Sequence, residues 1–103
     1  MKTFTQLKRD IKQGIKIKTI LNNCRPEKNG QVRTVAVVQS NAIGFEIPEE
    51  EQHRNIHGEI QKVSWLWWGK ASQYEYENNT FKVFEDIKGE RVLLFIYEII
   101  QGE

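Results

Sequence analysis

The chain has 103 residues, of which 39% are hydrophobic and 28% charged, and its formal net charge is +1. This composition excludes an intrinsically disordered chain. The longest apolar runs, "VSWLWW" and "VLLFIYEII", are too short to span a bilayer. The length suits one domain, residues 1–103, with a single modest hydrophobic core. We therefore expect a small globular protein without a membrane partner.

The charges are divided unevenly along the chain. Residues 1–33 hold nine Lys and Arg against two acidic residues, whereas residues 34–103 hold six against twelve. If the two groups stay apart in the fold, one face attracts polyanions and another attracts basic protein surfaces. The alternative is that both groups are solvated faces whose charges cancel in space.

The N-terminal segment "TFTQLKRDIKQG" predicts a helix. Thr3 and Gln6 have the spacing of a capping box, in which each side chain satisfies a free backbone N–H at the helix start. Phe4, Leu7 and Ile11 form a narrow apolar stripe at helical spacing. We expect this stripe to face the core.

The rest of the chain has strand character. Extended segments separated by short turns are "IKIKTIL", "VRTVAVVQ", "AIGFEI", "KVSWLWW", "QYEYE", "TFKVFED" and "RVLLFIYEII". Short connections force antiparallel neighbours, because a parallel pair needs a crossover of about a dozen residues or more. The fold class expected is α+β: an N-terminal helix followed by a five- to six-stranded antiparallel sheet, curled into an SH3-like, partly closed barrel.

The longest irregular segment, "PEEEQHRNIHGE" at residues 48–59, contains the only two histidines. His53 and His57 are four residues apart and share a face if the segment is helical. Together with Cys24 and Glu50 they provide the ligand types of one structural zinc ion, the only cofactor expected. The alternative is a solvated acidic loop that binds no metal.

No enzyme is expected, and no residue is a catalytic candidate. Arg54 follows His53 where the "HExxH" metalloprotease motif requires a glutamate. The chain also lacks a glycine-rich phosphate motif and a nucleophile with a histidine base near it in sequence.

The segment "VSWLWWGKASQYEY" is the candidate protein-binding region. Alternation sends Trp65 and Trp67 to one face of a strand and Trp68 to the other. Trp and Tyr are enriched at binding hot spots, although they also fill the cores of small barrels. The candidate partner-binding residues are Trp65, Trp67, Trp68, Tyr74 and Tyr76, with the acidic Glu75 and Glu77.

A second function class, nucleic-acid binding, rests on the basic N-terminal helix and first strand. Lysine and arginine contact phosphates with an affinity that is insensitive to sequence and falls with salt. The candidate residues are Lys8, Arg9, Lys12, Lys16 and Lys18. The acidic remainder of the chain argues against this alternative.

The strings "TFTQLKRDIKQGIKIKTI", "VRTVAVVQSNAI" and "VSWLWWGKASQYEYENNTFKVFE" resemble small accessory proteins encoded by bacteriophages and other mobile genetic elements. Several proteins of this kind are anti-CRISPR proteins. The resemblance implies a stoichiometric inhibitor of a host defence protein, most directly of a Cas9-type nuclease, and it carries over no functional residue.

The same resemblance implies the cytoplasm of a bacterial host cell as the place of action. The composition agrees with that expectation, because Cys24 is the only cysteine and "MKTFTQLKRD" contains no apolar signal region.

Overall fold

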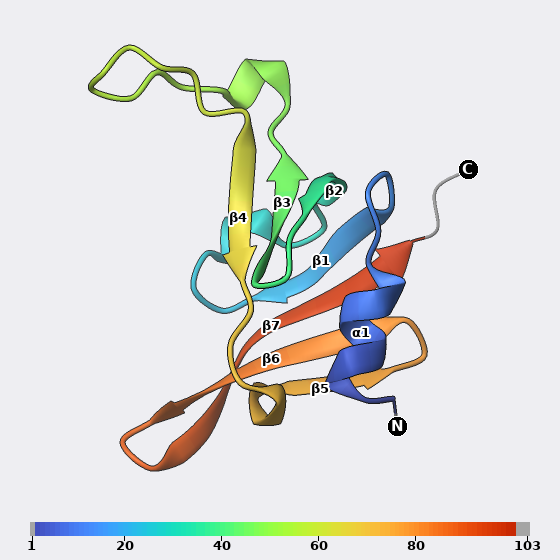
Figure 1. The fold of residues 1–103 in the computed structure, drawn as a ribbon. Helices are drawn as coiled ribbons and strands as arrows, with labels where there is room; N and C mark the ends of the chain where they lie inside the picture. Colours follow the sequence, from blue (N-terminus) through green and yellow to red (C-terminus); the bar gives the residue numbers. More distant parts are fainter. Residues whose placement is uncertain (1, 101–103) are drawn as a thin grey trace.

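The computed structural model describes residues 2–100 (Figure 1). Within this range the chain forms one α-helix, α1 (Phe4–Asp10), and seven strands. The strands are β1 (Lys16–Asn22), β2 (Val32–Val38), β3 (Ala42–Glu46), β4 (Val63–Trp67), β5 (Tyr74–Glu77), β6 (Thr80–Ile87) and β7 (Glu90–Ile100). Single turns of 3-10 helix lie in the connections: η1 (Pro26–Lys28), η2 (Glu49–Glu51) and η3 (Ala71–Gln73).

Helix α1 begins as its sequence predicts. Thr3 Oγ1 accepts a hydrogen bond from the backbone N–H of Gln6 at 3.2 Å, and Gln6 Oε1 accepts one from the N–H of Thr3 at 2.9 Å. Leu7 and Ile11 are almost completely buried, so the apolar stripe faces the core. The helix ends at Asp10 because the backbone of Ile11 is extended. In residues 2–100 no helix has the length and apolar character needed to cross a membrane.

The strands form one antiparallel sheet in the order β4-β3-β2-β1-β7-β6-β5. The expected α+β class, a helix followed by an antiparallel sheet, is confirmed. The sheet has seven strands rather than five or six, because all seven extended segments pair, including the four-residue β5. Among the described residues no ladder joins the edge strands β4 and β5, so the sheet is open. Its topology does not confirm an SH3-like barrel.

The sheet bends at β2, where the chain passes from one half of the sheet to the other. Residues 32–34 pair with β1, whereas residues 35–38 pair with β3, and a shift of register lies between Val35 and Val37 of that second ladder. Strands that change partner at a bulge form corners between sheet halves. Figure 1 shows the result: β3 and β4 run upright, whereas β1, β7 and β6 slope across the view.

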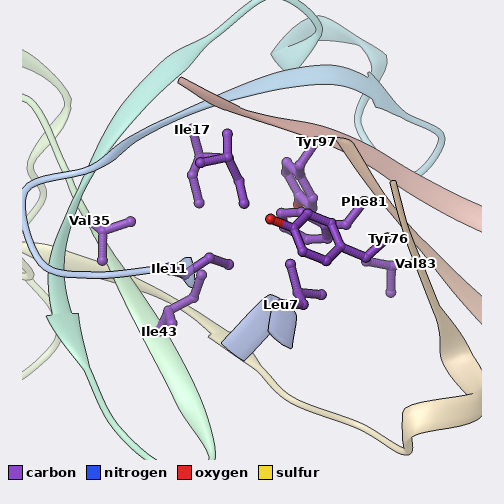
Figure 2. Close-up of a cluster of buried hydrophobic side chains, with 10 residues drawn as sticks. Leu7, Ile11, Ile17, Val35, Ile43, Tyr76, Phe81, Val83 and Tyr97 are labelled. Atoms are coloured by element: carbon purple, nitrogen blue, oxygen red, sulfur yellow. The ribbon is translucent and has the colours of Figure 1, made fainter. Parts of the chain in front are cut away.

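The core lies between α1 and the inner faces of both sheet halves (Figure 2). Helix α1 and six strands supply its buried side chains: Leu7, Ile11, Ile17, Val35, Ile43, Tyr76, Phe81, Val83, Tyr97 and Ile99. The backbone N–H of Lys2 donates to the carbonyl of Tyr76 at 2.9 Å, which ties the N-terminal segment to β5. The beginning of the chain therefore packs against one of the two sheet edges.

The alternation of buried and exposed side chains is interrupted in β1, and this changes which residues lie on the inner face of the sheet. Ile17 and Thr19 are buried, in agreement with the pattern of the sequence. A register shift between Thr19 and Leu21 then turns Asn22 inward, where it is 7% exposed, while Leu21 is only partly buried. The bulge thus places a polar amide where alternation predicts an apolar side chain.

Candidate functional site

Trp65 and Trp67 form an exposed aromatic pair on the outer face of the edge strand β4. Their indole rings stack with centroids 5.9 Å apart and planes inclined by 29°. Trp65 is 38% exposed and Trp67 62%. Alternation predicted that these two residues share a face, and the ladder with β3 confirms it. We call Trp65 and Trp67 the tryptophan pair.

Small residues of β3 lie under the tryptophan pair. Trp65 stands opposite Gly44, and Trp67 stands opposite Ala42, which is completely buried. A Cβ atom added to Gly44 would collide with Val63 and lie 3.3 Å from Cζ3 of Trp65. The absence of a side chain at position 44 therefore lets the indole of Trp65 lie close to the backbone of β3.

The other aromatic candidates pack within the fold. Trp68 and Tyr74 enclose Phe4 of α1, with ring centroids 5.6 Å and 4.5 Å from it. The Tyr74 hydroxyl accepts a hydrogen bond from the N–H of Gly69 at 2.6 Å, and burial raises the pKa of Tyr74. These rings join α1 to the β4–β5 connection, so their contacts are structural.

Tyr76 also belongs to the core, where it is 1% exposed. Its hydroxyl donates a hydrogen bond to Asp10 Oδ2 at 2.6 Å. Burial, followed by this hydrogen bond and the charge of Asp10, raises the pKa of Tyr76 to about 12. Tyr76 therefore presents no exposed ring to a partner.

The acidic candidates lie on β5, at the other edge of the sheet from the tryptophan pair. Glu75 forms an ion pair with Arg91 of β7, and Glu77 is exposed at the end of the strand. The structure therefore does not gather the seven partner-binding candidates on one surface.

The basic candidates are divided between the two faces of the sheet. Lys8, Arg9 and Lys12 belong to α1 or the residues just after it, and α1 packs on the inner face, which carries Ile17. Lys16 and Lys18 flank Ile17 in β1 and point to the outer face. The structure therefore does not gather the five basic candidates on one face of the sheet.

The segment around the two histidines is not helical beyond η2. It forms a narrow hairpin, which we call the finger (residues 52–62), with a bridge between Arg54 and Ile60. Asn55 Oδ1 accepts hydrogen bonds from the backbone N–H groups of His57 and Glu59 and closes its tip. Figure 1 shows the finger projecting away from the sheet.

The proposed zinc ligands are not assembled by this geometry. Cys24 and His53 border one cavity, whereas Glu50 and His57 lie outside it. Across residues 2–100, no group of three or more His, Cys, Asp or Glu side chains is placed to hold a metal ion. Structural zinc stays a prediction of the sequence.

The cavity next to Cys24 opens between the β1–β7 half of the sheet and strands β3 and β4, and has a volume of about 510 Å³. Its walls include the apolar side chains of Ile17, Phe45, Leu66 and Phe95. Three buried polar residues also line it: Thr19, Asn22 and Tyr97. Burial, followed by the charge of Cys24, raises the pKa of Tyr97 to about 12.

The mouth of the cavity is basic. Arg25, Lys28 and Arg33 line it, together with a single carboxylate, that of Glu51. Arg33 Nη2 donates to both carboxylate oxygens of Glu51, at 3.0 Å and 2.9 Å, so these two charges offset each other. Among the described residues, Arg25 and Lys28 form no ion pair.

Sequence reasoning did not find this cavity, because its lining comes from five strands, two loops and the start of the finger. Arg25 and Lys28 belong to a segment that reads as an ordinary turn. The inward position of Asn22 depends on a bulge that alternation does not show. Three residues of the lining, Cys24, His53 and Trp65, are candidates from the sequence, but the first two are predicted as zinc ligands and the third as a partner-binding residue.

No protein-family model, curated protein or solved structure matches this chain. The functional conclusions therefore rest on the two surfaces described above, the tryptophan pair and the cavity.

Proposed function

We propose that this protein acts by binding another protein through the tryptophan pair, as a stoichiometric inhibitor without catalytic activity. One observation supports the proposal above all others: Trp65 and Trp67 stack on each other while they remain exposed on an edge strand. Large aromatic side chains that stay exposed together are typical of protein interfaces. Their mutual stacking also fixes their rotamers before a partner arrives, which lowers the entropic cost of binding.

Strand β4 offers a second means of contact. Within residues 2–100 it forms a ladder with β3 alone, so its other edge carries backbone groups that are free to pair with an incoming strand. Strand addition next to Trp65 and Trp67 would combine backbone hydrogen bonds with two aromatic anchors. The proposed interface is therefore the outer face and the free edge of β4.

The proposed partner is a Cas9-type nuclease of a bacterial host, and the proposed origin of the chain is a bacteriophage or other mobile element. The sequence resemblance supports this partner class. Charge is also consistent with it, because Cas9-type effectors hold nucleic acid in basic channels. The turn Glu49–Glu51, in which Glu51 pairs with Arg33 while Glu49 and Glu50 are exposed, follows β3 at the end where β4 begins. Two acidic side chains therefore lie at one end of the proposed interface.

The experiment is an inhibition assay with a purified Cas9-type nuclease, its guide RNA and a target duplex. The wild-type protein is expected to abolish cleavage at about one equivalent, as tight stoichiometric binding requires. The double variant Trp65→Ala/Trp67→Ala is expected to lose inhibition. The matched control is Ile87→Ala, which removes a side chain that is 44% exposed in the β6–β7 hairpin.

One result would contradict the proposed partner, and another would contradict the proposed interface. Full cleavage in the presence of excess wild-type protein, across several Cas9-type nucleases, would overturn the partner class. Inhibition by the double variant that equals the wild type would overturn the tryptophan pair as the interface.

A further inference from the structure

The cavity between the β1–β7 half of the sheet and strands β3 and β4 has a polar floor whose hydrogen-bonding capacity is only partly used within the protein. Thr19, Asn22 and Tyr97 are only 9%, 7% and 8% exposed, yet all three line the cavity. The Oδ1 atom of Asn22 accepts hydrogen bonds from the backbone N–H groups of Cys24 and Arg25, at 3.0 Å and 2.8 Å. These two bonds fix the orientation of the amide.

The remaining polar atoms of the floor face the cavity itself. Among residues 2–100, the Asn22 Nδ2 amide and the hydroxyls of Thr19 and Tyr97 form no hydrogen bond with protein groups. No fully buried side-chain nitrogen or oxygen in this range lacks a partner. These three groups therefore have accessible surface, and because all three residues line the cavity, a ligand with donors and acceptors bound there can pair with them.

The walls of the cavity are suited to a flat ring. The ring of Tyr97 lies between those of Phe95 and Phe45, with centroids 5.7 Å and 6.4 Å away. The three rings form a continuous aromatic wall beside the polar floor. Aromatic surfaces of this kind bind planar ligands by stacking and edge contacts.

The basic residues at the mouth of the cavity favour a ligand that carries negative charge. Arg25 and Lys28 have no carboxylate partner among the described residues, because the one carboxylate at the mouth, Glu51, is engaged by Arg33. Guanidinium and ammonium groups at a pocket entrance favour an anionic group, and a phosphate satisfies both.

We propose that this cavity is a binding site for a free nucleoside monophosphate. The base would stack on the aromatic wall and pair with the floor, and the phosphate would lie at Arg25 and Lys28. The volume of about 510 Å³ falls within the range of about 300–1,000 Å³ that is usual for small-molecule sites. Neither a purely apolar ligand nor a bare phosphate uses all three features of the cavity.

The test is a calorimetric and NMR titration of the full chain with AMP, GMP, CMP and UMP, with adenosine and inorganic phosphate as partial ligands. At least one monophosphate is expected to bind about tenfold or more tightly than either partial ligand. Absence of binding by all four monophosphates at millimolar concentration would overturn the proposal. Tighter binding of a short single-stranded oligonucleotide would also overturn it, because the ligand would then be a nucleic acid strand.

Variants locate the binding to the cavity. Arg25→Gln is expected to weaken binding about tenfold, and Tyr97→Phe severalfold, because a charge-assisted hydrogen bond contributes more than a neutral one. Arg9→Gln is the matched control, since it removes an exposed arginine of α1 and is expected to change the affinity less than twofold. Equal affinity of wild type, Arg25→Gln and Tyr97→Phe would place the ligand elsewhere and contradict the proposal.

This inference does not depend on the proposed function. Trp65 borders the cavity as well as belonging to the tryptophan pair, whereas Trp67 lies outside the cavity. Trp67→Ala is therefore expected to retain nucleotide binding while it weakens binding to a partner protein. Loss of nucleotide binding in this variant would contradict a nucleotide site that does not include Trp67.

Discussion

Trp65 lies over Gly44, its partner across the β3–β4 ladder, and Cζ3 of the indole would be 3.3 Å from a Cβ atom at position 44. The position of the indole, and through stacking that of Trp67, depends on the missing side chain. A glycine in a strand interior otherwise weakens the strand, so its presence here has a structural reason.

The first prediction is that Gly44→Ala destabilises the protein and disturbs the tryptophan pair. The new methyl group collides with Val63 and crowds Trp65, and such overpacking costs about 1–3 kcal/mol of unfolding free energy. Urea denaturation measures the cost, and tryptophan fluorescence reports the indole environment. Ser40→Ala, in an exposed turn, is the control and is expected to change stability by less than about 0.5 kcal/mol. Wild-type stability and fluorescence in Gly44→Ala would refute the proposed crowding.

The second prediction concerns the hydrogen bond from Tyr76 to Asp10. Tyr76→Phe removes the hydroxyl and is expected to lower the free energy of unfolding at pH 7 by about 1–2 kcal/mol. Tyr97→Phe is the control, because Tyr97 lines the cavity and removal of its hydroxyl breaks no hydrogen bond within residues 2–100. Its stability at pH 7 is expected to remain close to that of the wild type.

The stabilising effect of Tyr76 is expected to depend on pH. The folded protein raises the pKa of Tyr76 from 10.0 to about 12, so the folded chain keeps a proton that the unfolded chain loses in this interval. The stabilisation is complete below pH 10 and is lost as the pH rises towards 12. The difference between wild type and Tyr76→Phe should therefore shrink above pH 10. A difference that stays constant between pH 7 and pH 11.5 would contradict the assigned pKa.

The third prediction separates protein binding from nucleic-acid binding. The triple variant Lys8→Glu/Arg9→Glu/Lys12→Glu reverses the charge beside α1, on the sheet face opposite Lys16 and Lys18. We expect it to inhibit the nuclease as the wild type does. Tight binding of nonspecific DNA by the wild type, with a steep salt dependence that this variant abolishes, would favour the nucleic-acid alternative.

The fourth prediction is the zinc content that the sequence implies. Elemental analysis of protein purified without a histidine tag is expected to find about one equivalent of zinc if His53 and His57 are ligands. His53→Ala and His57→Ala should then each lower the zinc content and the melting temperature. A zinc content below about a tenth of an equivalent in the wild-type protein would contradict the zinc hypothesis.

Local patterns predicted the local features of the fold well. The capping box of Thr3 and Gln6 forms as its spacing indicates, and alternation places Trp65 and Trp67 together on one face. Both features depend on a few neighbouring residues and on backbone geometry that is the same in all proteins. The antiparallel arrangement followed from the short connections for the same reason.

Features that depend on the whole chain were not predictable in this way. The bulge at residue 20 reverses the inward side of β1 and buries Asn22, although alternation favours Leu21. The strand count was too low although all seven extended segments were identified in the sequence, because the pattern does not show which of them join the sheet. The cavity is assembled by the corner at β2, which brings loops distant in sequence together. The hydrophobic periodicity of the sequence does not indicate this corner.

The most direct test of the central claim is the affinity of the double variant Trp65→Ala/Trp67→Ala for the purified nuclease, measured by calorimetry beside the wild type and Ile87→Ala. If the tryptophan pair is the binding surface, the double variant is expected to lose affinity by about a hundredfold or more, since each hot-spot tryptophan contributes about 2 kcal/mol or more. Ile87→Ala should bind as the wild type does. An affinity of the double variant within about threefold of the wild type, a difference below about 1 kcal/mol, would show that the tryptophan pair is not the binding surface.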